Sequence, residues 1–210
     1  MKKLKIVFEN KNLIVIDKEP KKLTIATDKN NYNNLYHEVR EYVKKQYPKN
    51  KIFIVHRLDK DTSGLVIFAK NEDIKRELQN NWEKVTREYY AVVNGIPKDK
   101  KGTIINYLVE DKNLNVYITN NKRIGKKAIT HYEVIKSNKK YSLLKIKIDT
   151  GRKNQIRVQL SNIGNPILGD KKYGSIDNPL KRLCLHANLI KYKDYTFESK
   201  IPNNFDKITN

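Results

Sequence analysis

The sequence runs Val55-His56-Arg57-Leu58-Asp59-Lys60-Asp61-Thr62-Ser63-Gly64-Leu65 between two apolar stretches, 52–55 and 65–69. These apolar stretches have the length of buried strands, so the polar residues between them are predicted to form a loop that joins two strands. Asp61, Thr62 and Ser63 are typical of a turn, and Gly64 can supply a positive φ. His56, Arg57 and Asp59 belong instead to the exit of the first strand, where a scaffold can fix their direction. For Asp59, a simple ion pair with Arg57 is the alternative to a catalytic role.

The residues before this stretch predict a hairpin and a helix. Two apolar runs within Lys5 to Asp17, separated by a short polar segment, indicate two strands around a tight turn. From Asn34, apolar residues recur at helical spacing, and this amphipathic helix should end before Pro48. A second helix is expected after the predicted strand 65–69, with Asn71 at its N-terminus and Ile74, Leu78 and Trp82 on its apolar face.

The residues after it predict more strands and one further helix. Strands are expected at Tyr89 to Val93, Ala128 to Ile135 and Leu143 to Ile148, and the last alternates apolar residues with lysine. Asn154 is a suitable N-cap for a helix that carries Ile156, Leu160 and Ile163, which places Arg157 in its first turn. No repeat, linker or change of composition divides the chain. The sequence therefore predicts one continuous α+β domain over residues 1–210.

The charge balance points to a polyanionic partner. The 44 Lys and Arg residues outnumber the 23 Asp and Glu residues, which leaves a net charge of +21. The alternative is that lysine is spread evenly over the surface without a binding role. Two stretches favour nucleic acid because they resemble basic, glycine-bearing loops, namely 98–102 and 120–127, the second with Lys122, Arg123, Lys126 and Lys127.

Composition also excludes several classes of protein. The absence of any apolar run near the ~20 residues that cross a bilayer excludes an integral membrane protein. The single Cys184 excludes an intramolecular disulfide, suits the reducing cytoplasm, and is expected to be an inert buried thiol. The four histidines lack ligand spacing, so no metal site is predicted.

Several motifs together resemble the pseudouridine synthases of the RluA type. The stretch from His56 to Leu65 is similar to the signature of that family in full. Three further motifs agree in order and spacing: Arg87-Glu88-Tyr89-Tyr90-Ala91-Val92-Val93-Asn94-Gly95, Thr150-Gly151-Arg152-Lys153-Asn154-Gln155-Ile156-Arg157-Val158 and Arg182-Leu183-Cys184-Leu185-His186-Ala187. The segments Pro166-Ile167-Leu168-Gly169-Asp170 and Tyr173-Gly174 lie between the last two. The resemblance covers nearly the whole chain.

The resemblance implies a fold, a reaction and a set of site residues. The fold would be α+β, with a mixed, mostly antiparallel central sheet and the active cleft across it. The reaction would be the isomerisation of uridine to pseudouridine inside RNA without a cofactor. By position, Asp59 is similar to the essential aspartate of the family, Tyr89 to its active-site tyrosine and Arg157 to the basic residue that pairs with the aspartate. Whether Asp59 acts as a nucleophile or as a base stays open at this point, because a carboxylate can serve in either role.

The resemblance also implies an RNA substrate. Ribosomal RNA is favoured, with transfer RNA as the alternative within the same chemistry. His56 or Arg57 could occupy the space that an extruded base leaves, and Leu183 and Leu185 would border its pocket. Many relatives carry an additional RNA-binding domain of the S4 type before the signature; here no such domain is expected, and neither is an obligate assembly, so the protein would act as a monomer.

Two departures and two other classes of function complete the analysis. Positions 154 and 159 are Asn and Gln where the family usually has histidine, which leaves Asp59, Tyr89 and Arg157 unchanged. A non-catalytic RNA-binding or ribosome assembly factor on the same scaffold is disfavoured by these three intact residues. A glycoside hydrolase with Asp59 and Asp61 as paired carboxylates is weaker still, since the charge suits RNA better than neutral glycans.

Overall fold

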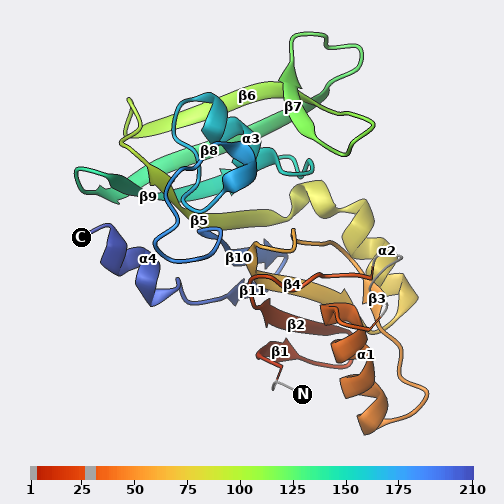
Figure 1. Ribbon diagram of the computed structural model, residues 1–210. Helices are drawn as coiled ribbons and strands as arrows, with labels where there is room; N and C mark the ends of the chain where they lie inside the picture. Colours follow the sequence, from red (N-terminus) through yellow and green to blue (C-terminus); the bar gives the residue numbers. More distant parts are fainter. Residues whose placement is uncertain (1–3, 27–31) are drawn as a thin grey trace. The chain divides into compact units, whose positions relative to one another are not determined.

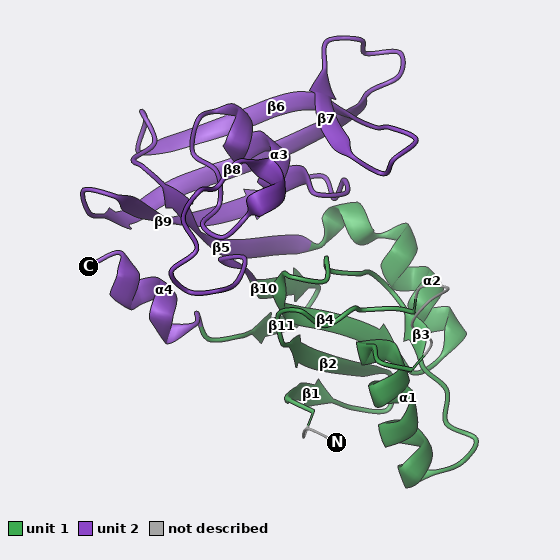
Figure 2. Cartoon of the chain, viewed as in Figure 1, with its two compact units in different colours: residues 1–85, 187–200 green, residues 86–186, 201–210 purple. Residues whose placement is uncertain are grey.

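The computed structural model describes residues 4–26 and 32–210. The fold divides into two compact units (Figure 2). Each unit has a hydrophobic core of its own. Unit 1 comprises residues 1–85 and 187–200, and unit 2 comprises residues 86–186 and 201–210. The predicted α+β class with a mostly antiparallel sheet is confirmed, since every pairing described between named strands is antiparallel.

Unit 1 is built on the predicted hairpin and its neighbouring strands (Figure 1). Strand β2 pairs with β1 on one side and with β4 on the other, and β4 also pairs with the short β3. Strand β10 continues this order beyond β4 and pairs with β11. The strands of unit 1 are β1 (Ile6–Glu9), β2 (Leu13–Lys18), β3 (Phe53–Ile54), β4 (Ser63–Ala69), β10 (Leu185–Tyr192, whose first two residues belong to unit 2) and β11 (Tyr195–Glu198).

The two α-helices found among the described residues of unit 1 begin where the sequence predicts. The Asn34 side chain accepts a hydrogen bond from the His37 N–H at the start of α1 (Leu35–Gln46), and Asn71 does the same for the Ile74 N–H at the start of α2 (Glu72–Asn80). Both are N-caps of the kind that satisfies an otherwise unpaired amide in the first turn. The second helix is shorter than predicted, because Trp82 lies in a separate 3₁₀ turn, η1 (Trp82–Lys84).

Unit 2 is a five-stranded antiparallel arrangement in the order β5-β9-β8-β6-β7. Its strands are β5 (Thr86–Asn94), β6 (Lys101–Glu110), β7 (Val116–Thr119), β8 (Lys126–Ser137) and β9 (Tyr141–Ile148). Its helical elements are α3 (Gln155–Asn162), η2 (Lys171–Tyr173) and α4 (Asn203–Ile208). In β9, Leu144, Ile146 and Ile148 are buried whereas Lys147 is exposed, as the alternation predicted.

The predicted basic loop 98–102 is only partly a loop. Lys101 and Gly102 are the first residues of β6, a strand that the sequence analysis did not predict. A Cβ atom at Gly102 would lie 2.7 Å from the ring of Tyr132 on the neighbouring strand, so another residue here would require that ring to shift. The glycine therefore marks a close packing of side chain on backbone rather than a turn.

Candidate functional site

The segment 56–64, called the Asp59 segment below, is fixed to the rest of unit 1 through its backbone. The ammonium group of Lys18, which is only 1% exposed, donates to the carbonyl oxygens of Glu19 (3.1 Å), Lys22 (2.8 Å) and Lys60 (3.0 Å). A buried lysine is rare, and here carbonyl dipoles compensate for its lost hydration. Its bond to the residue after Asp59 holds the segment from one side.

A second anchor lies on the other side of Asp59. The Thr24 hydroxyl donates to the carbonyl oxygen of Leu58 (2.8 Å) and accepts from the Leu58 N–H (3.2 Å). The Thr62 N–H donates to the Asp59 carbonyl oxygen (3.2 Å), which closes the turn that follows. Asp59, which is partly exposed, therefore sits between two residues with fixed backbones.

Gly64 ends the segment in the positive-φ conformation that the sequence predicts, with φ of 112°. Residues other than glycine rarely adopt this conformation. A Cβ atom here would also lie 2.1 Å from the carbonyl oxygen of Ala187 in β10. Glycine is therefore required at position 64 for two reasons, the positive φ and the close approach of the β10 backbone.

His56 and Arg57 occupy different surroundings. The His56 ring stacks on Trp82, with 4.5 Å between ring centroids, and its Nε2 accepts from the Ile67 N–H (3.1 Å). The Arg57 side chain is exposed. The role of either residue in RNA binding stays a prediction.

Arg157 lies in the first turn of α3, as predicted, within unit 2. Its Nε and Nη2 atoms donate to the two carboxylate oxygens of Asp170, at 2.7 and 2.8 Å. Its Nη1 donates to the Asn154 side-chain oxygen (3.0 Å), and its guanidinium carbon lies 5.0 Å from the centre of the Tyr173 ring. The predicted ion pair of Arg157 with Asp59 would join the two units and stays a prediction.

Asn154 precedes α3, but it does not cap the helix as predicted. Its backbone is left-handed, with φ of 53°, and its side chain makes no capping hydrogen bond. The side chain instead accepts from Arg157 and donates to the Tyr173 hydroxyl (3.0 Å). A capping asparagine has extended backbone, so the left-handed conformation turns the amide toward these partners instead.

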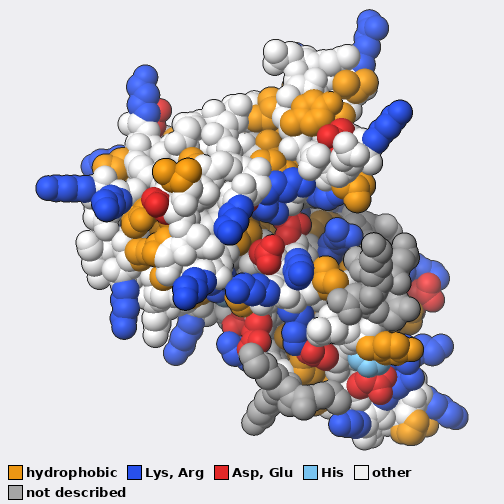
Figure 3. All heavy atoms as spheres, viewed as in Figure 1, with side chains coloured by type: hydrophobic (Ala, Val, Ile, Leu, Met, Phe, Trp, Pro, Cys, Tyr) orange, Lys and Arg blue, Asp and Glu red, His pale blue; other side chains and the backbone are white. Residues whose placement is uncertain are grey.

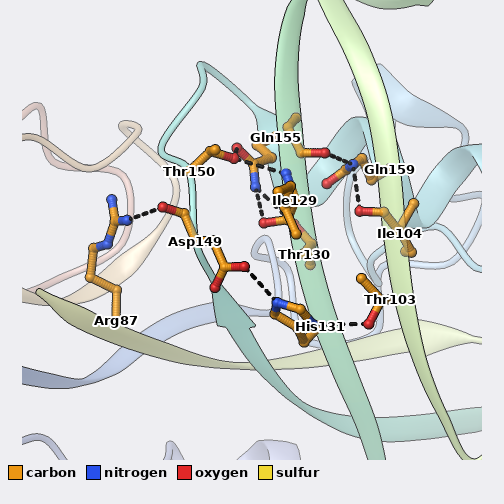
Figure 4. A network of polar contacts seen from close by, with 11 residues as sticks. Arg87, Thr103, Ile104, Ile129, Thr130, His131, Asp149, Thr150, Gln155 and Gln159 are labelled. Carbon is orange, nitrogen blue, oxygen red and sulfur yellow. Dashed lines mark hydrogen bonds and ion pairs between the residues drawn. The ribbon is translucent and has the colours of Figure 1, made fainter. Parts of the chain in front are cut away.

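Two buried glutamines tie α3 to the strands beneath it (Figure 4). The Gln155 amide donates to the Ile129 carbonyl oxygen and the Thr130 hydroxyl, and its oxygen accepts from the Thr150 hydroxyl. Gln159 donates to the Ile104 carbonyl oxygen (3.2 Å) among other acceptors. Because these anchors lie on both sides of Arg157 in the sequence, they fix the backbone from which its side chain projects.

Tyr89 lies on β5 in register with Ile146 of β9, partly buried against the core of unit 2. Leu183 and Leu185, which were predicted to border a pocket, are each 4% exposed and belong to the same core. Between them Cys184 is buried as predicted, and burial raises the pKa of its thiol to about 12. This thiol is therefore protonated and unreactive at neutral pH.

The predicted basic loop 120–127 keeps its four cations exposed: Lys122, Arg123, Lys126 and Lys127. Figure 1 shows that it follows β7, and its last two residues already belong to β8. Asn121 organises it, since its side chain accepts from the Arg123 N–H (3.0 Å) and its carbonyl oxygen from the Gly125 N–H (3.0 Å). Lys122 lies over the Tyr107 ring, with Nζ 5.7 Å from its centre.

Cationic side chains are not confined to this loop. In Figure 3, Lys and Arg side chains project from many points of the visible face. A groove of about 510 Å³ on the sheet of unit 2 also carries Lys101, Lys145 and Lys147, but none of the predicted site residues lines it. Within residues 4–26 and 32–210, no helix is long and apolar enough to span a membrane, and no cluster of potential metal ligands is found.

Sequence reasoning missed four residues that hold the candidate site. Lys18 follows an apolar strand like any solvated lysine, and Thr24 has no distinguishing neighbour. Asp170 and Tyr173 were noted as part of the resemblance but received no role. The one signal in the sequence was a neighbouring glycine, Gly169 before Asp170 and Gly174 after Tyr173.

Comparisons with known proteins identify the family of the chain. The family described as RNA pseudouridylate synthase matches residues 12–162. The chain is 36% identical over 208 residues to the ribosomal large subunit pseudouridine synthase D of Haemophilus influenzae, covering 90% of this chain and 62% of the relative. It is 34% identical over 195 residues to an uncharacterized RNA pseudouridine synthase of Bacillus subtilis, covering 90% and 63%. The chain thus spans less than two thirds of the length of these relatives.

The fold has a close match among solved structures. Human RNA pseudouridylate synthase domain containing 4 superposes with a TM-score of 0.82 at 22% identity, and the match covers 96% of this chain and 90% of the human chain. This likeness concerns the fold.

Proposed function

Because the chain belongs to the RNA pseudouridylate synthase family, we propose that it isomerises uridine to pseudouridine in RNA, with Asp59 as the catalytic carboxylate. The observation that carries the proposal is the anchoring of the Asp59 segment. A buried ammonium and a buried hydroxyl fix the backbone immediately after and before Asp59. Such positioning is what a reactive group needs in order to meet its target in a productive geometry.

The reaction breaks the bond from N1 of uracil to the ribose and forms a bond from C5. A carboxylate can begin it either by attack on the nucleotide or by abstraction of a proton. Arg157 would stabilise the ionised form of Asp59, and Tyr89 would stack on the uracil ring. The base must first leave its stack at a cost of about a few kcal/mol. His56 or Arg57 would offset this cost by occupying the space that the extruded base leaves.

The proposed substrate is ribosomal RNA. The name of the Haemophilus influenzae relative, ribosomal large subunit pseudouridine synthase D, supports this substrate class. The exposed cations of loop 120–127 would contact phosphates and supply affinity without sequence preference. We propose that the protein works as a monomer in the cytoplasm, where its single thiol stays reduced; a second species in sedimentation analysis would contradict the monomer.

Release of tritium from RNA labelled at uridine C5 tests the reaction, because C5 loses its hydrogen when the new bond forms. We expect release by the wild-type protein from ribosomal RNA, less from transfer RNA, and essentially none by Asp59→Asn. Asp61→Asn is the matched control, since Asp61 is an exposed carboxylate in the same segment. It should release tritium at the wild-type rate.

Two results would count against the proposal. Full activity of Asp59→Asn would remove the carboxylate from the reaction. Equal losses in Asp59→Asn and Asp61→Asn would mean that the segment, rather than Asp59 itself, had been damaged.

A further inference from the structure

Asp170 and Arg157 form an ion pair that is almost fully withdrawn from water. The two side chains are 1% and 12% exposed. Two parallel hydrogen bonds join them, from Nε to Oδ2 (2.7 Å) and from Nη2 to Oδ1 (2.8 Å). This fork fixes the plane of the guanidinium as well as its position.

Two other residues complete the surroundings of the guanidinium. Asn154 accepts from Nη1 at 3.0 Å, and its amide nitrogen donates to the Tyr173 hydroxyl at 3.0 Å. The Tyr173 ring faces the guanidinium, and the Tyr173 N–H donates to Asp170 Oδ1 (3.3 Å). The carboxylate, the amide and the ring are thus linked to each other as well as to Arg157.

The backbone around Asp170 is itself fixed. The Asp170 N–H donates to the Ile167 carbonyl oxygen, and the Asp170 carbonyl oxygen accepts from the Ser175 N–H, both at 3.0 Å. Gly169, with φ of 80°, lies against Arg182, where a Cβ atom would be 2.1 Å from the carbonyl oxygen. Asp170 therefore holds its place independently of Arg157.

A buried ion pair of this kind contributes little net stability, because the desolvation of both charges offsets their attraction. What it does contribute is orientation. A long arginine side chain has many rotamers, which would otherwise spread the guanidinium over many positions.

We propose that Asp170 is the positioning residue for Arg157, and that Asn154 and Tyr173 assist it. The proposal rests on the function proposed above and assigns a role to the segment Gly169-Asp170 and to Tyr173. Asp170 acts through Arg157 and does not touch the RNA. Its loss therefore lowers kcat and leaves RNA binding unchanged.

The test is a double-variant cycle on tritium release. Asp170→Asn keeps the size of the side chain but removes its charge. It also replaces one acceptor oxygen by an amide N–H₂ donor, which cannot accept a hydrogen bond from Arg157. We expect kcat to fall about 10- to 100-fold, the range that misplacement of a catalytic group produces, with KM unchanged. In an Arg157→Lys background, which already lacks the fork, the same substitution should lower kcat by less than about threefold.

A purely structural role predicts a different result. The losses in kcat from Asp170→Asn and Arg157→Lys would then multiply in the double variant. Either that outcome or wild-type kcat in Asp170→Asn would overturn the proposal. If the wild-type protein released no tritium, the proposed function would fail instead, so the two failures are distinguishable.

Two further variants make the cycle robust. Asp177→Asn is the matched control, because Asp177 lies in the same loop region between α3 and β10 as Asp170. Its carboxylate accepts hydrogen bonds from Asn94 Nδ2 (3.0 Å) and from the Tyr141 hydroxyl (3.3 Å). The substitution should leave kcat unchanged. Asn154→Ala serves if Asp170→Asn does not fold, because it removes the acceptor of Nη1 and keeps the buried carboxylate. It should lower kcat severalfold, again with no further loss in the Arg157→Lys background; additive loss would count against positioning.

Discussion

The Asp59 segment and the basic loop 120–127 both connect strands, but they are held in different ways. The Asp59 segment receives its bonds from residues far away in the sequence, the buried Lys18 and Thr24. The basic loop is organised by its own Asn121 and presents its cations to solvent. A group that takes part in bond breaking needs a fixed place, whereas a phosphate contact needs mainly a charge within reach.

The largest effect should follow from removal of the buried cation. Lys18→Met leaves three backbone carbonyl groups without their donor. We expect the free energy of unfolding to fall by about 3 kcal/mol and tritium release to be lost with it. Denaturant unfolding measures the first quantity.

The same substitution in the basic loop is the control for Lys18. Lys122→Met should change the free energy of unfolding by less than about 0.5 kcal/mol, because Lys122 is exposed. Equal effects in the two regions would contradict the contrast between them.

An intermediate effect is expected on RNA affinity from the basic loop. Replacement of Lys122, Arg123, Lys126 and Lys127 by Ala should reduce the slope of log affinity against log salt by about 3, at roughly 0.7 to 0.9 per phosphate contact. The free energy of unfolding and kcat at saturating RNA should stay as in the wild type. Fluorescence titrations at several salt concentrations give the slope.

A variant of equal charge separates the loop from a general surface effect. Lys45, Lys49, Lys51 and Lys84 are exposed lysines of unit 1, and their replacement by Ala removes the same four charges. If both variants lose the same slope, the lysines act as a diffuse surface charge and the loop has no special role.

The smallest effect is expected on the stability of unit 1, from the carboxylate of Glu9. Glu9 of β1 accepts from Lys70 Nζ (2.6 Å) and the Tyr42 hydroxyl (3.0 Å). Burial raises the pKa of Glu9, but the hydrogen bonds from Lys70, Tyr42 and Gln46 outweigh it, so its pKa lies below the ordinary 4.5. Its contribution to stability is therefore present above the unfolded-state pKa and is lost as pH falls through the folded-state pKa.

Glu9→Gln should accordingly reduce the free energy of unfolding by about 0.5 to 1 kcal/mol at pH 7. The difference from wild type should shrink below pH 4.5. Urea unfolding at several pH values would reveal it. A constant difference down to pH 3 would show that the ionised carboxylate is not what these contacts favour.

The sequence predicted elements whose residues act locally. Asn34 and Asn71 were identified as helix starts because an N-cap depends on residues within one turn. Strand β6 was missed because its charged residues and its glycine resemble a loop until the ring of Tyr132 is placed beside it. Its pairing with β8 depends on contacts distant in the chain.

The same distinction between local and distant contacts applies to the candidate site. The motifs led to the prediction of Asp59, Tyr89 and Arg157 as site residues, which stays a prediction, and Arg157 was correctly placed in the first turn of its helix. The bonds of Lys18 to Lys60 and of Asp170 to Arg157 follow no periodicity, so no sequence pattern indicates them. Asn154 was assigned the wrong role because the sequence does not reveal its left-handed backbone or its side-chain contacts with Arg157 and Tyr173.

The contact of Gly64 with Ala187 also bears on the order in which the protein is completed during synthesis. Residues 86–184 leave the ribosome before β10, the strand that carries Ala187, although most of that strand belongs to unit 1. A nascent chain can therefore contain all the strands of unit 2 while the sheet of unit 1 still lacks β10. The Asp59 segment therefore gains its contact with Ala187 only after the strands β5 to β9 of unit 2 have been synthesised.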